Sequence, residues 1–132
     1  MQPWLAFPDI VQRVLDLAIE IQQIPAPTLS EGARAEFVRQ RFQAEGIPSV
    51  EMDAVGNVLA RWPGEGLAPP LVISAHLDTV FPFGTDLSFR RSEGKLHGPG
   101  IGDNSLGVAA LFGLLWHWQR QMARLPGDVW LV

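Results

Sequence analysis

The chain has 132 residues, of which 47% are apolar, and a formal net charge of −4. This length and balance suit one globular domain over residues 1–132, and the absence of a basic run argues against nucleic acid as a partner. No cysteine is present, so thiolate metal sites and cysteine nucleophiles are excluded and any metal must be held by His, Asp or Glu.

The sequence also indicates whether the chain crosses a membrane and where in the cell it is located. The longest apolar stretch, residues 106–118, is shorter than the ~20 residues of a membrane-spanning helix, so we expect no membrane partner. The opening residues carry no cationic region and are interrupted by Pro3 and Pro8, which is unlike a secretory signal. We therefore expect a cytoplasmic protein.

Two helices are predicted in the first third of the chain. Apolar residues recur every three or four positions after Asp9, which predicts an amphipathic helix that Pro25 ends. Thr28 and Glu31 have the spacing of a capping box, and the pattern that follows predicts a second helix over about 29–45.

Four segments have strand character. Residues 49–52 and 57–62 predict a hairpin. Residues 71–75 form a continuous run of β-formers, typical of a strand buried on both faces, and residues 128–132 predict a further strand. With the helices, these strands predict an α/β fold with a mixed, mostly parallel sheet flanked by helices.

Between the strands at 71–75 and 128–132 lies a long loop followed by a helix. Residues 77–103 are rich in Gly and Pro, with one short hairpin expected over 89–97, and a loop of this length in a compact domain is often functional. Asn104 or Ser105 can cap a third helix over about 105–122, whose apolar first turns should be deeply buried.

His76 and Asp78 follow the strand at 71–75, at its carboxyl end, where open α/β sheets bind ligands. In extended backbone, residues two positions apart point to the same side, so Asp78 can contact the ring nitrogen of His76 that faces away from a ligand. A carboxylate in that place orients a metal-bound histidine. The alternative is a histidine at a strand end with a salt-bridged neighbour.

A second candidate site lies in the glycine-rich turn 98–105, which contains Asp103. A phosphate loop is excluded because Asp103 stands where a dinucleotide fingerprint needs glycine and no Gly-Lys-Ser/Thr follows. The glycines instead allow a sharp turn from which Asp103 can project toward the strand ends. The alternative role for Asp103 is a helix cap.

Taken together, the two segments resemble the co-catalytic zinc exopeptidases and deacylases, a group that includes aminoacylase, acetylornithine deacetylase, peptidase T and glutamate-releasing carboxypeptidases. Fainter similarities to the group occur around Pro25, Gly56 and Gly64. The segments that carry the resemblance are Val72-Ile73-Ser74-Ala75-His76-Leu77-Asp78-Thr79-Val80-Phe81-Pro82 and His97-Gly98-Pro99-Gly100-Ile101-Gly102-Asp103.

The resemblance implies a role for each matching residue. His76 corresponds to a ligand of one zinc, Asp78 to the catalytic-site carboxylate that orients it, and Asp103 to the aspartate that bridges two zincs, with a cis peptide between Asp103 and Asn104. The implied cofactor is Zn²⁺, two ions per complete site, with Co²⁺ or Mn²⁺ as other possibilities. The implied reaction is hydrolysis of a peptide or N-acyl amino acid by metal-activated water.

The family's Glu-Glu pair, a further acidic ligand and a second histidine have no counterpart in this chain. His97 and His117 do not replace them by motif, and Glu65 and Glu93 lie in predicted turns. We therefore expect an N-terminal portion with an incomplete site, inactive alone, that forms a homo-oligomer or joins a missing C-terminal portion through a free strand edge at 129–132. The alternative is a non-catalytic module for assembly or partner binding.

Overall fold

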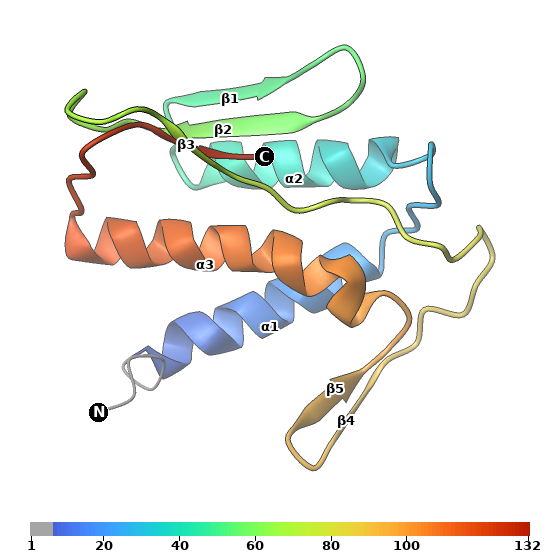
Figure 1. The fold of residues 1–132 in the computed structure, drawn as a ribbon. Coiled ribbons are helices and arrows are strands. Elements are labelled where there is room, and N and C mark those ends of the chain that lie inside the picture. Colours follow the sequence, from blue (N-terminus) through green and yellow to red (C-terminus); the bar gives the residue numbers. More distant parts are fainter. Residues whose placement is uncertain (1–6) are drawn as a thin grey trace.

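The structure, a computed structural model, describes residues 7–132. Its helices and strands follow one another in the order expected from the sequence (Figure 1). They are α1 (Pro8–Gln22), α2 (Gly32–Ala44), β1 (Ser49–Met52), β2 (Val58–Trp62), β3 (Leu71–Ile73), β4 (Arg90–Ser92), β5 (Lys95–His97), an irregular turn (Ile101–Ser105), α3 (Leu106–Gln121) and β6 (Val129–Leu131).

The second helix starts later than predicted, and the prediction of a capping box is wrong. Glu31 is the N-cap residue of α2, and no side chain caps the helix. The Thr28 hydroxyl donates instead to Asp78 at 2.6 Å, and the Glu31 carboxylate accepts the Leu29 N–H at 2.6 Å. Both polar groups are therefore already bonded outside the helix, which begins only at Gly32.

The four-stranded sheet has the order β1-β2-β6-β3. It is mixed, as predicted, because β6 pairs antiparallel with β2 and parallel with β3. Parallel pairing is not the majority among the described strands, since the β1–β2 hairpin adds a second antiparallel pair. The expected free edge at 129–132 is also wrong, because β6 lies inside the sheet with a strand on each side.

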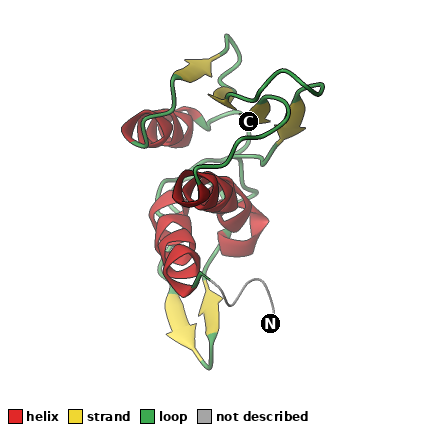
Figure 2. Ribbon diagram, turned by 90° about the vertical axis from the view of Figure 1, so that its left-hand side faces the viewer, coloured by secondary structure: helices red, strands yellow, loops and turns green. Residues whose placement is uncertain are grey.

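β1 and β3 are the two edge strands of the described sheet, and the burial of β3 differs from the prediction. Leu71 is 55% and Val72 60% exposed, so β3 is not covered on both faces. A continuous apolar run is typical of a strand between two layers, but it does not specify what covers each side. In the described chain the three helices lie on one side of the sheet (Figures 1 and 2).

The core lies between this side of the sheet and the helices. Alternation along β2 and β6 places Val58, Ala60, Val129 and Leu131 inward. Phe42 of α2 and Phe112 of α3 stack with ring centroids 4.1 Å apart and are fully buried. One face of α3 is buried, whereas Leu106 in its first turn is 39% exposed, so the expectation of deep burial holds for that face only.

The two predicted hairpins are confirmed. The turn between β1 and β2 is closed by Asp53, whose carboxylate accepts hydrogen bonds from the backbone N–H groups of Val55 and Asn57 and from the Asn57 side chain. These bonds lower the pKa of Asp53, the one from the Asn57 side chain most. The second hairpin, β4–β5, projects away from the sheet (Figure 2). Within residues 7–132 no helix is long and apolar enough to cross a membrane.

Candidate metal centre

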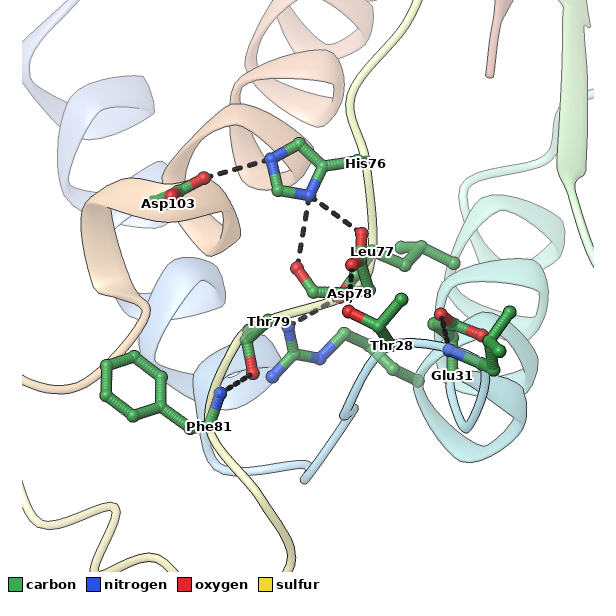
Figure 3. Close-up of polar contacts among 10 residues, drawn as sticks. Thr28, Glu31, His76, Leu77, Asp78, Thr79, Phe81 and Asp103 are labelled. Atoms are coloured by element: carbon green, nitrogen blue, oxygen red, sulfur yellow. Dashed lines mark hydrogen bonds and ion pairs between the residues drawn. The ribbon is translucent and has the colours of Figure 1, made fainter.

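His76 lies just beyond the carboxyl end of β3, and the alternation of the extended chain sets its direction. Ile73, Ala75 and Leu77 pack against the core, so His76 points to the opposite side. Its Nε2 atom lies 2.9 Å from Oδ1 of Asp103 (Figure 3). The predicted convergence of the strand end and the glycine-rich turn is confirmed.

Asp78 contacts the other side of the imidazole ring. The Nδ1 atom of His76 lies 3.1 Å from Oδ1 of Asp78 and 3.1 Å from its carbonyl oxygen (Figure 3). Both atoms are acceptors and favour a proton on Nδ1, so Nε2, which faces the Asp103 carboxylate, is the nitrogen on the side open to a cation. The hydrogen bond from Thr28 is the main cause that holds the pKa of Asp78 below its usual value, and His76 adds to it. Asp78 is therefore a carboxylate at neutral pH.

Asp103 projects from the irregular turn before α3 rather than from the helix itself. Gly100 has a φ of 73°, which favours glycine, and a Cβ atom at this position would lie 3.2 Å from the Thr79 side chain. The peptide between Asp103 and Asn104 is cis, as the resemblance implied. Ser105 is the N-cap residue of α3 but makes no side-chain capping bond. The Asp103 side chain is 84% exposed, so its carboxylate is accessible to a ligand.

Two residues at this site were not identified from the sequence. The spacing of Thr28 predicts a helix cap, and only the position of Arg34 in the helix pattern marks that residue as unusual. Arg34 lies four and eight residues before the buried Val38 and Phe42, so a charged group falls on the apolar stripe of α2. In the structure its guanidinium bonds the Leu77 carbonyl, between His76 and Asp78.

A cavity of about 450 Å³ opens beside His76 and Asp78. It lies between α2, the end of β3, the first turns of α3 and the β1–β2 turn. Its apolar lining includes Val38, Phe42 and Val108. The site therefore combines a polar rim with an apolar pocket, an arrangement common in small-molecule sites.

The other histidines lie in different surroundings. His97 in β5 contacts the Ser92 hydroxyl at 3.2 Å, and His117 packs edge-on against Phe7 at 4.8 Å between ring centroids. Among residues 7–132 no group of three or more His, Asp or Glu side chains is placed to hold a metal ion. His76 and Asp103 thus present two converging donor atoms, with Asp78 behind the histidine.

An imidazole beyond the end of β3 and a carboxylate from the turn before α3 meet in a candidate metallohydrolase centre. Residues 72–132 match peptidase family M20/M25/M40. The chain is also 30% identical over 102 residues to succinyl-diaminopimelate desuccinylase from Corynebacterium glutamicum, an alignment that covers 76% of this chain and 27% of that protein. The resemblance seen in the sequence is confirmed.

Solved structures of peptidases share the fold. Aminopeptidase PepT from Bacillus cereus superimposes with a TM-score of 0.77 at 19% identity, and a tripeptidase from Staphylococcus aureus with 0.74 at 22% identity. Each comparison covers 91% of this chain and 35% of the other. The chain thus spans about a third or less of the length of these relatives.

Proposed function

We propose that this chain contributes one part of the active site of a metal-dependent hydrolase that cleaves a peptide or N-acyl amide bond at an amino acid. The observation that supports it best is the convergence of His76 Nε2 and Asp103 Oδ1, with Asp78 on the far side of the ring. The M20/M25/M40 match over residues 72–132 supports the same reaction class.

The donor set fits a divalent cation of borderline hardness. Zinc bonds to His nitrogen and Asp oxygen are ~2.0–2.2 Å long, so two donor atoms 2.9 Å apart can both contact one ion. In our proposal His76 and Asp103 would hold the ion, Asp103 would also face a second one, and Co²⁺ or Mn²⁺ could replace Zn²⁺. When bound, the metal supplies Lewis acidity toward the scissile carbonyl and toward water.

The chain's own residues supply position and charge. Asp78 holds the His76 ring and favours the tautomer that exposes Nε2. Asp103 brings a negative charge to the other side of the ligand position. The cavity beside His76 and Asp78 offers apolar surface next to the site. A general base is still required, and we propose that another polypeptide or segment provides it together with the remaining ligands.

Hydrolysis assays test this function. We expect no turnover of dipeptides, tripeptides or N-acyl amino acids, N-succinyl amino acids included, by the purified chain with Zn²⁺, Co²⁺ or Mn²⁺, because a missing general base alone costs ~10²–10⁴ in rate. We expect hydrolysis when the polypeptide encoded downstream is added, and its loss in His76→Ala. Failure of that mixture on every substrate would reject the proposal. Turnover by the chain alone would reject the incomplete site.

The alternative, a non-catalytic module for assembly, rests on the exposed edge and side chains of β3. It predicts that the chain binds a partner or a second copy equally well after His76→Ala. The complementation assay separates the two functions because only the hydrolase requires His76.

A further inference from the structure

We propose that Arg34 and Thr28 are positioning residues that hold the His76–Asp78 pair in its ligand-binding orientation. The inference builds on the proposed function only in calling His76 a ligand. It concerns the support of the site, which comes from α2 and the segment before it.

Arg34 fixes the backbone between the two site residues. Its Nη1 donates to the Leu77 carbonyl at 2.8 Å, and its Nε and Nη2 donate to the Ile24 carbonyl at 3.1 and 2.6 Å. Leu77 stands between His76 and Asp78, so a fixed Leu77 carbonyl holds the peptide plane that leads into Asp78 and restrains the backbone that follows His76. The guanidinium thus clamps the strand end to the end of α1.

Thr28 fixes the carboxylate itself. Its hydroxyl donates to Oδ2 of Asp78 at 2.6 Å, whereas Oδ1 of the same carboxylate faces the His76 ring at 3.1 Å. Each oxygen thus has its own partner, and a rotation of the carboxylate would break both contacts. Figure 3 shows Thr28 and His76 on different sides of Asp78.

The two backbone segments also run side by side. Pro27 and Thr79 form an isolated parallel bridge, and the Thr79 N–H donates to the Ala26 carbonyl at 2.8 Å. Three sets of contacts therefore join the same two segments: the hydrogen bonds of Arg34, this bridge and the hydrogen bond of the Thr28 hydroxyl. Together they hold the strand end against α2 and the turn before it.

The burial of Arg34 argues for more than filling space. The residue is 2% exposed, and its hydrogen bonds in the described chain go to carbonyl oxygens. Burial lowers the pKa of Arg34, and the nearby negative charge of Asp78 opposes that shift. A guanidinium is costly to bury unless its donors are used, and a lysine cannot span two carbonyls as a planar fork does. An apolar side chain would suffice for packing on this stripe.

The experiment uses nitrogen NMR of the His76 ring in the full chain, without metal and during titration with Zn²⁺ alone. In Thr28→Val we expect displaced ring signals and zinc affinity weaker by ~10–100-fold, the range found when groups behind a metal ligand are removed. Thr28→Ser keeps the hydroxyl and should restore both. Thr85→Val removes a threonine hydroxyl that bonds Pro82 and should leave both unchanged.

Arg34→Lys and Arg41→Lys form the second matched pair, because both keep the charge and both lie on α2. Arg41 bonds the exposed Glu20, so only Arg34→Lys should displace the ring signals and weaken zinc binding. Should Arg34→Lys fail to fold, the Thr28 variants decide. Unchanged ring signals in Thr28→Val and in folded Arg34→Lys overturn the inference. If the unmodified chain binds no zinc, the proposed function fails, and the metal-free ring signals alone decide on positioning.

Discussion

The imidazole of His76 and the carboxylate of Asp103 lie 2.9 Å apart, although the two residues are 27 positions apart in the sequence. The end of β3 brings the histidine, and the turn that starts α3 brings the aspartate. Each side chain is more than half exposed, at 52% and 84%, so the pair is open to a ligand.

His76→Ala and Asp103→Ala should each abolish zinc binding by the chain. Removing a group behind a ligand costs ~10–100-fold in metal affinity, so removal of a ligand should exceed that range. Calorimetric or NMR titration with Zn²⁺ measures the effect. His97→Ala is the control, because His97 bonds Ser92 within the β4–β5 hairpin. Equal loss in the control would show that zinc binds elsewhere.

The exposed edge of β3 should drive association. Among the described strands β3, like β1, has a partner on one side only, and its Leu71 and Val72 are more than half exposed. We expect concentration-dependent dimers or larger species in sedimentation at micromolar protein. Val72→Lys places a charge on this strand and should shift the chain toward monomer. A stable monomer in the unmodified chain would refute this prediction.

Gly64→Ala should destabilise the fold. A Cβ atom at this position would lie 2.1 Å from the carbonyl carbon and oxygen of Gly127, and backbone cannot yield as a side chain can. We expect a loss of ~1–3 kcal/mol in the free energy of unfolding, the usual range for an overpacked site. Gly32→Ala has open space and should be neutral or stabilising by up to ~1 kcal/mol. Chemical denaturation measures both.

Asp128 should make stability depend on pH in the acid range. Its hydrogen bond from Arg61, at 2.7 Å, is the main cause that lowers its pKa in the folded state, and the N–H of Gly64 adds to it. Because the pKa of Asp128 is lower in the folded than in the unfolded state, its ionised form stabilises the fold. This stabilisation is complete above the pKa of the unfolded state, ~3.9, and is lost as the pH falls through the pKa of the folded state.

Asp128→Asn should therefore be less stable than the unmodified chain at pH 7, with a difference that shrinks below about pH 4. Urea unfolding at pH 7 and pH 3 measures the difference. Glu51→Gln, at an exposed carboxylate of β1, is the control and should change stability little at either pH. A difference that stays constant between pH 7 and pH 3 would contradict the assigned role.

Local patterns predicted most of the helices and strands and the pairing of His76 with Asp78. These features depend on periodicity and on the alternation of extended backbone, which neighbouring residues determine. The resemblance implied that Asp103 would join them. Local patterns could not predict that β6 lies between β2 and β3, because strand order depends on contacts between segments far apart in the sequence.

Thr28 and Arg34 show a second limit. Thr28 has the spacing of a capping residue, and only the approach of the strand end gives its hydroxyl a different acceptor. Arg34 falls on an apolar stripe, which marks it as unusual without showing which carbonyls it meets. Tertiary contacts decided the role of both residues, whereas local preference alone would have assigned neither.

The insertion of β6 has a consequence for the order of folding. Leu131 pairs with Ala60 on one side and with Ile73 on the other, so β2 and β3 share no ladder until β6 arrives. During synthesis the β1–β2 hairpin can form early, but the sheet stays open until residues 129–131 have left the ribosome. Pairing of strands that lie far apart in the sequence is slow compared with helix formation. We therefore expect α1 and the hairpin to form well before the strand end that holds His76 becomes ordered.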